Sequence, residues 1–279
     1  NFVDPIYYHR SNRVQSVCNI LELERNQPLH SKNFNHIIVD DKHKLLYCYV
    51  PKVACTNWKR ILMFLNDYSD FRDPLDIPAN DSHQADAFRT LDSYTPLEKE
   101  QRIEHYFKFL FVRHPFDRLV SAYRNKFTQN YNIYFHNRYG RLIIQKYRTK
   151  ASKESLQRGN DVTFSEFVQY LTDPQTHGTP LNEHWMPVFD LCHPCHIKYD
   201  VVGKFESLDK DADAVLRQIK TDKIMTFPKK NRTITKITDD FLNTLSPEQL
   251  FKLYQVYVID FKMYNYSYSN LDYYIPDMF

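Results

Sequence analysis

The chain has 279 residues, of which 42% are hydrophobic and 25% charged, so it is long enough for a sizeable core and has an ordinary globular composition. Its net charge of +3 is too small for a protein that coats nucleic acid, so anion binding must rest on local basic patches. With only 4 glycines, it contains neither G-x-x-x-x-G-K-[ST] nor G-x-G-x-x-G, which excludes Walker-type and Rossmann-type nucleotide loops.

The sequence contains hints of a secretory protein. No apolar run approaches the ~20 residues of a membrane span, and the start shows no signal-peptide pattern, so an anchor is expected to lie outside this sequence. Glycosylation sequons begin at Asn80, Asn231 and Asn265. Five cysteines allow at most two disulfides with one thiol left over, which fits an oxidising lumen. They are Cys18, Cys48, Cys55, Cys192 and Cys195.

The first third of the chain predicts an arm, a strand and a helix. Residues 1–43 are polar and are expected to form an N-terminal arm packed on the main domain, with a short helical pattern near "VQSVCNILELE". "KLLYCYV" (44–50) is a continuous apolar run, typical of a strand buried on both faces. The residues that follow carry one apolar helix face, with Thr56 or Asn57 as a natural cap. That face consists of Trp58, Ile61, Leu62 and Leu65.

The rest of the chain alternates strands with helices. Residues 66–106 read as a loop with a helical piece around "PLEKEQRIEHY", and "FKFLFV" (107–112) as a second buried strand before a helix that Pro115 opens. "YDVVGKFESL" (199–208) reads as a third strand, and capping boxes open helices at "TFSEFVQYL" and "SPEQLFKLYQVYVIDF". This alternation predicts an α/β fold with a parallel sheet, in one domain spanning 44–279.

Two strand-to-helix junctions carry candidate anion sites. Lys52 lies just before a predicted helix N-terminus, where unpaired N–H groups attract an anion, and Thr56 and Asn57 could donate to the same oxygens. Taken alone, this stretch favours an ordinary capped helix with a solvated lysine. Arg113 ends the second strand and Ser121 follows eight residues later, so the two could bind one phosphate, with Arg118 and Arg124 adding charge. Two such junctions suggest a ligand with phosphates at both ends.

Three blocks then give a specific resemblance. "VPKVACTNWKR", "FLFVRHPFDRLVSAYRNKF" and "NEHWMPVFDLCHPCHIKYDVVGKFESL" resemble, in the same order, Golgi carbohydrate sulfotransferases of the branch that sulfates position 4 of N-acetylgalactosamine (GalNAc) in chondroitin and dermatan. The likeness covers about residues 44–265. It implies a sulfotransferase-like P-loop-type fold with a central parallel sheet flanked by helices. It also implies a type II membrane protein of the Golgi lumen.

The resemblance further implies a sulfate donor, 3′-phosphoadenosine 5′-phosphosulfate (PAPS), and no metal. Its 3′-phosphate would bind Arg113 and Ser121. Its phosphosulfate would bind the turn made of Pro51, Lys52, Val53, Ala54, Cys55, Thr56, Asn57 and Trp58.

Sulfuryl transfer needs a cation for the leaving group and a base for the acceptor hydroxyl. Lys52 is expected to bond the bridging oxygen as it leaves. Of 12 histidines, the resemblance favours His83 as the base, with His184 beside Glu183 as second choice or as an acceptor-binding residue. A glycan on Asn80 would crowd His83, so that sequon is expected to be unused.

"CHPCH" (192–196) admits several readings. It matches haem c attachment, a redox C-x-x-C or half a zinc site, but the sequence has no second ligand pair with zinc-finger spacing, and the motif precedes a strand. A structural disulfide is preferred.

Basic residues supply a candidate acceptor surface for an anionic glycosaminoglycan. "RYGRLIIQKYRTK" (138–150) begins with Arg138 and Arg141, and Arg124 and Lys126 lead into it; "FPKKNRT" (227–233) is a second basic loop. The rivals are a sulfotransferase for another acceptor (terminal GalNAc or glucuronate of glycoproteins), a nucleotide kinase and a secretory glycan-binding lectin. The sequence leaves the oligomeric state open.

Overall fold

The computed structural model describes residues 4–23, 34–68, 71–84, 86–176, 181–228 and 235–268. The chain divides into two compact units, residues 1–113 with 188–231 and residues 114–187 with 232–279. Each is described by itself. The sequence-based division into an arm (1–43) and a catalytic domain (44–279) stays a prediction.

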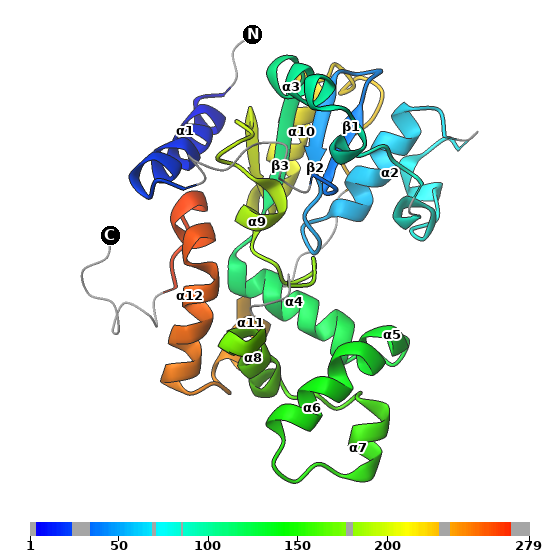
Figure 1. Cartoon of the computed structure of the whole chain (residues 1–279). Coiled ribbons are helices and arrows are strands. Elements are labelled where there is room, and N and C mark those ends of the chain that lie inside the picture. Colours follow the sequence, from blue (N-terminus) through cyan, green and yellow to red (C-terminus); the bar gives the residue numbers. More distant parts are fainter. Residues whose placement is uncertain are drawn as a thin grey trace. The chain divides into compact units, whose positions relative to one another are not determined.

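The first unit is built on a four-stranded sheet in the order β1-β2-β3-β4 (Figure 1). β2, β3 and β4 run parallel, whereas β1 pairs antiparallel with β2. The three predicted strands and the α/β class are thus confirmed, and β1 is an additional edge strand that the arm supplies. The strands are β1 (Ile37–Asp40), β2 (Leu45–Cys48), β3 (Phe107–Val112) and β4 (Val201–Lys204).

Helices cover the sheet because alternate strand residues point to opposite faces. Tyr47 and Phe109 face Trp58 of α2, with ring centroids 6.0 and 4.9 Å away. Cys48, which points to the other face, is bonded to Cys192 of α9, and α1 and α10 both contact β4. The helices of this unit are α1 (Pro5–Ile20), α2 (Cys55–Leu65), α3 (Pro96–His105), α9 (Val188–Cys192) and α10 (Leu208–Gln218).

Gly203 of β4 permits a close approach in this layer. A Cβ at this position would lie 2.4 Å from the Phe111 ring of the neighbouring strand. Any side chain there would therefore displace a core aromatic residue.

Among its described residues, the second unit is helical. Its core is an aromatic cluster that includes Phe116, Tyr123, Phe167, Trp185 and Phe261, all buried. Both predicted capping boxes are present, at the starts of α8 and α12. Its helices are α4 (Pro115–Phe127), α5 (Ile133–Phe135), the π-helix η5 (His136–Gly140), α6 (Arg141–Tyr147), α7 (Lys153–Arg158), α8 (Phe164–Thr172), α11 (Thr235–Leu242) and α12 (Pro247–Tyr264).

Short 3₁₀ turns complete the described chain. Those used below are η3 (Asp81–His83) and η7 (Phe205–Ser207), and the others are η2 (Pro74–Asp76), η4 (Leu91–Ser93) and η6 (Pro174–Thr176). No helix among the described residues is both long enough and apolar enough to cross a membrane.

Candidate active site

The turn between β2 and α2 is the first candidate anion site. Lys52 and Ala54 both have left-handed backbone conformations, with φ of 71° and 59°. α2 begins at Cys55, so the expectation that Thr56 or Asn57 caps it is wrong: Ala54 is the cap residue, and its methyl group accepts no hydrogen bond. The first N–H groups of a helix have no carbonyl one turn earlier in the same helix to bond. In α2 the Asn57 N–H bonds the Ala54 carbonyl at 3.1 Å, and the cap residue makes no side-chain hydrogen bond to this end of the helix. This arrangement suits an anion better than an ordinary capped helix would.

The side chains of the turn divide by burial. Lys52, Ala54, Thr56 and Asn57 are partly exposed. Trp58 is fully buried and packs on Phe111 at 5.2 Å. The other buried members are Pro51, Val53 and Cys55.

His83 lies beside this turn. Its Nε2 is 2.9 Å from Oγ1 of Thr56, on the first turn of α2. η3 carries the imidazole to that position, and the side chain is exposed. The buried Ser82 fixes η3 by donating its hydroxyl hydrogen to the Ala79 carbonyl at 2.8 Å. Two residues that are 27 positions apart in the sequence therefore meet at one helix N-terminus.

Arg113 joins the same turn from the neighbouring strand. It directly follows β3, and its Nη1 donates to the Lys52 carbonyl at 3.3 Å. The guanidinium also lies over the Phe205 ring of η7, 4.6 Å from the centroid. Because β2, β3 and β4 are parallel, all three of these residues lie at the carboxyl edge of the sheet, where open α/β sheets bind ligands.

The remaining predicted site residues belong to the second unit. Ser121 is partly buried on α4, two turns beyond its start. His184 follows Glu183, and its Nδ1 is 2.8 Å from the side-chain amide oxygen Oδ1 of Asn182, so Nδ1 carries the proton of the neutral ring. The Glu183 carboxylate is 3.7 Å from the same nitrogen. Asn182 thus orients the imidazole.

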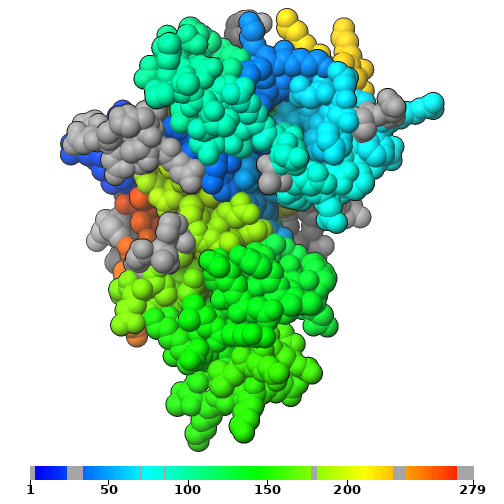
Figure 2. All heavy atoms as spheres, turned by 45° about the vertical axis from the view of Figure 1, so that its right-hand side comes forward, coloured from blue at the N-terminus to red at the C-terminus, as the bar shows by residue number. Residues whose placement is uncertain are grey.

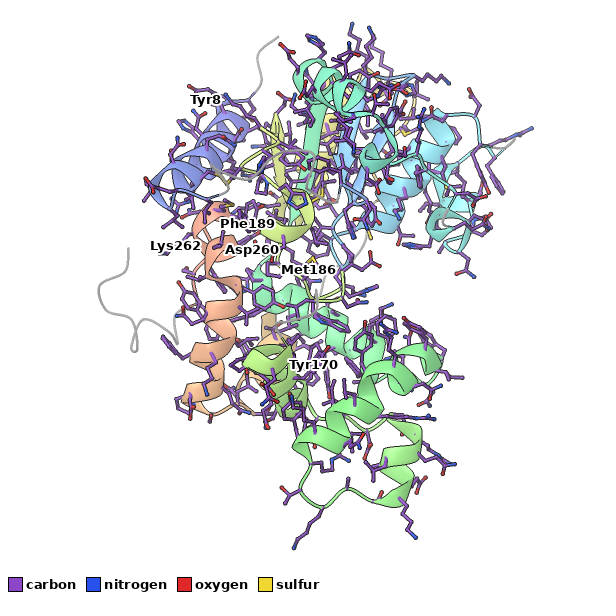
Figure 3. The ribbon with its side chains drawn as sticks, in the orientation of Figure 1. Tyr8, Tyr170, Met186, Phe189, Asp260 and Lys262 are labelled. Atoms are coloured by element: carbon purple, nitrogen blue, oxygen red, sulfur yellow. A yellow bond between two sulfur atoms is a disulfide. The ribbon has the colours of Figure 1, made fainter. Side chains whose placement is uncertain are left out.

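Arg118 holds the backbone on both sides of His184 in place. Arg118 was expected to add charge to the phosphate site, but it is buried and donates to the carbonyls of Met186 (labelled in Figure 3) and Glu183 at 2.6 and 2.8 Å. The Tyr257 hydroxyl donates to the Trp185 carbonyl from α12. Such backbone clamps could not be read from the sequence, because nothing local distinguishes Arg118 from its solvated neighbours.

The predicted basic surface is only partly available for a ligand. Arg124, Arg138 and Arg141 are exposed, and Lys126 lies over the Phe135 ring at 4.4 Å. Later in the same stretch, side chains are committed to ion pairs: Lys146 with Asp173, and Arg148 with Asp161 and Glu166. In the second basic loop, residues 229–233 lie outside the described residues.

The cysteines are distributed as the sequence predicts. Cys18 pairs with Cys195 and Cys48 with Cys192, while the buried Cys55 remains a thiol. The preference for structural disulfides over haem, zinc or redox chemistry at "CHPCH" is confirmed, although its two cysteines bond to distant partners. Among the described residues no group of three or more His, Cys, Asp or Glu side chains could hold a metal ion.

Comparison with known proteins adds an independent line of evidence. The model of the sulfotransferase family matches residues 35–267. The chain is 47% identical to carbohydrate sulfotransferase 11 of Rattus norvegicus, over 95% of this chain and 77% of the relative. It is 45% identical to carbohydrate sulfotransferase 11 of Danio rerio, over 94% and 76%, and 39% identical to carbohydrate sulfotransferase 14 of Danio rerio, over 94% and 71%. No solved structure matches.

Proposed function

Because the chain belongs to the sulfotransferase family, we propose that it transfers the sulfuryl group of PAPS to the 4-hydroxyl of GalNAc in chondroitin or dermatan. The names of its relatives, carbohydrate sulfotransferases 11 and 14, support a carbohydrate acceptor. The observation that carries the proposal is the contact between His83 and Thr56, since it brings a base to the turn proposed for the sulfuryl group.

The donor would be held at both of its anionic ends. Lys52 and the N-terminus of α2 would bind the phosphosulfate, and Arg113 with Ser121 the 3′-phosphate. The hydrogen bond from Arg113 to the Lys52 carbonyl supports this arrangement, because it ties the two cationic residues to one stretch of backbone.

The reaction would be an in-line displacement at sulfur. The acceptor oxygen bonds to sulfur, its proton passes to His83, and the bond to the bridging oxygen breaks, leaving its electron pair on the departing 3′,5′-bisphosphate. Lys52 would stabilise the charge that develops on that oxygen. His184, whose Nδ1 proton is held by Asn182, is the second candidate base and otherwise an acceptor-binding residue.

The cellular setting belongs to the same proposal. Two disulfides support an oxidising compartment, and we propose the Golgi lumen, with a type II membrane anchor outside this sequence.

The decisive experiment measures sulfate transfer from PAPS to desulfated chondroitin and dermatan, with disaccharide analysis of the product. His83→Ala should bind 3′,5′-adenosine bisphosphate like the wild type but lose about 10²–10⁴ in kcat. Lys52→Ala should lose about 10²–10³ while keeping its fold. Wild-type rates in His83→Ala would assign the base to His184, and product sulfated elsewhere would refute the proposed position.

The rivals give different outcomes in a simpler assay. 3′,5′-Adenosine bisphosphate should raise the melting temperature of a sulfotransferase, whereas ATP with magnesium should raise that of a kinase. A lectin should respond to neither. Transfer to terminal GalNAc or glucuronate of glycoproteins, rather than to chondroitin, would identify the alternative acceptor.

A further inference from the structure

Three large side chains with apolar surface lie exposed within four residues of the second unit. Tyr131, Ile133 and Tyr134 are 71%, 63% and 61% exposed, and we call them the 131–134 patch. They belong to the loop before α5 and to α5 itself, in the part of the chain coloured green in Figure 2. Exposing such side chains in a group is unfavourable unless something covers them, so a patch of this kind marks a binding surface.

The patch is held in place rather than loosely attached. The Asn125 side chain of α4 donates to the Tyr131 hydroxyl at 3.0 Å. The Asn132 side chain donates to the Asn125 carbonyl, and the Tyr134 ring packs edge-on against the buried Phe135 at 5.3 Å. Such fixed side chains lose little conformational entropy when a ligand binds.

Basic groups surround these rings. Arg124 and Lys126 flank Asn125 in the sequence, and the Lys126 ammonium lies over Phe135. A hydrogen bond with Tyr139, followed by the charge interaction with Tyr134, raises the pKa of the exposed Arg138. Positive charge therefore lies beside aromatic rings of this surface at Lys126 and Arg138, which fits an anionic partner that also has apolar faces.

Contacts connect the patch to His184. The His184 ring packs edge-on against Phe135 at 5.4 Å, and Tyr134 contacts the same ring. The Tyr139 hydroxyl accepts from the Asn182 side chain at 3.3 Å, and Asn182 orients His184. A glycan lying at His184 would thus meet the patch a short way along its chain.

We propose that the 131–134 patch binds sugar rings of the anionic acceptor chain beside the ring that lies at His184. Pyranose rings present C–H faces that stack on tyrosine, while their carboxylates and sulfates pair with Arg124, Lys126 and Arg138. An anionic polysaccharide fits both features, whereas a purely apolar partner would leave the charges unused. This inference rests on the proposed function and adds that the enzyme should prefer long acceptors to short ones.

The test compares a long desulfated chondroitin chain with its tetrasaccharide. For the double variant Tyr131→Ala/Tyr134→Ala, we expect the KM for the long chain to rise about 10-fold, kcat to stay unchanged, and the kinetics on the tetrasaccharide to stay near those of the wild type. A tenfold effect corresponds to about 1.4 kcal/mol, within the range of a lost stacking contact. Tyr8→Ala is the matched control, since Tyr8 (Figure 3) is 63% exposed on α1 and should change neither substrate.

The outcomes separate this inference from the function on which it rests. An unchanged KM for the long chain in the double variant, with transfer to both acceptors intact, would overturn the patch assignment alone. Absence of transfer to either acceptor by the wild type would refute the proposed function instead. Arg138→Ala should weaken the salt dependence of the KM for the long chain. If the variant showed the same salt dependence as the wild type, the proposed pairing of Arg138 with the acceptor's anionic groups would be refuted.

Discussion

At the scale of single residues, the turn between β2 and α2 shows how a strand-to-helix turn of this kind forms without glycine. Lys52 and Ala54 take up left-handed conformations that usually cost a residue with a Cβ about 1–2 kcal/mol. Strain of this kind persists where the surroundings enforce it, and it collects at functional sites. The sequence indicated the place of the turn through Lys52. It could not indicate the conformation, because the propensities of lysine and alanine oppose it.

Phe205 is a positioning residue for Arg113, and its replacement gives the first prediction. Without the ring under the guanidinium, Phe205→Leu should bind 3′,5′-adenosine bisphosphate about 3–5-fold more weakly, the loss expected from a partly exposed cation–π contact of about 1 kcal/mol. Titration calorimetry would measure this. Phe205→Tyr keeps the ring and should bind normally, so equal affinity in the leucine variant would contradict the assigned role.

At the scale of elements, the longest and most periodic segments were predictable. The helix face of α2 and the strands β2, β3 and β4 followed from apolar patterning, because burial dictates residue type there. β1 is as long as β2 and β4, but it was missed because its short apolar run, Ile37–Val39, lies between polar residues in a stretch that was read as an arm. The helix predicted near "VQSVCNILELE" is in fact α1, which begins at Pro5 after its Asp4 cap.

The sequence showed that residues 138–150 are basic, but it could not show which of these side chains form ion pairs, because their acidic partners lie outside the stretch. The Arg148 guanidinium bonds both Glu166 oxygens at 2.7 and 2.8 Å, and the same carboxylate completes the capping box of α8. Burial would raise the pKa of Glu166, but the bonds from Arg148 and the backbone of Thr163 outweigh it and lower the pKa. Arg148 therefore has a structural role, and a pattern of charges alone could not reveal it.

Arg148→Met should accordingly destabilise the protein. It leaves a largely buried carboxylate without its partner, which should cost about 2 kcal/mol, less than for a fully buried pair because the guanidinium is partly exposed. Arg138→Met, at an exposed position in the same stretch, is the matched control and should melt like the wild type. Chemical denaturation would measure both. A stable Arg148→Met variant would show that the ion pair is dispensable.

The pKa of the Asp41 carboxyl predicts how the stability of the first unit depends on pH. Burial would raise the pKa of this carboxyl, but hydrogen bonds from Arg102, Tyr106 and Tyr94 outweigh it and lower the pKa to about 2. Because the pKa is lower in the folded state, the ionised carboxyl stabilises the fold at pH values above its pKa in the unfolded chain, about 3.9. This stabilisation disappears as the pH falls through 2. The bonds tie α3 to the turn after β1.

Melting curves of Asp41→Asn against wild type would test this linkage. The variant should melt lower at pH 6, and the difference should shrink between about pH 4 and pH 2, where the wild-type carboxyl becomes protonated. A difference that stays constant through this range would mean that the charge of Asp41 contributes nothing and that only its shape matters.

At the scale of the whole molecule, the disulfides are long-range links whose pairing no local pattern could indicate. They join residues 177 and 144 positions apart, within the first unit. Cys18–Cys195 fixes α1 to the segment before β4, and hydrogen bonds from Ser11 to the Tyr199 carbonyl and from Gln15 to the Pro194 carbonyl reinforce it. The cysteine count limited the number of bridges to two, whereas the partners depend on the fold.

Such large loops make the disulfides strong restraints on the unfolded chain, so reduction should lower the free energy of unfolding by about 4–5 kcal/mol per bridge on the chain-entropy account. The double variant Cys18→Ser/Cys195→Ser removes the bridge to α1, and unfolding in denaturant would measure how much that bridge contributes to stability. Cys55→Ser is the control, because Cys55 forms no disulfide and its replacement should leave the response to reductant unchanged. If the double variant unfolded at the wild-type denaturant concentration, the non-covalent contacts of α1 with its unit would suffice to hold it.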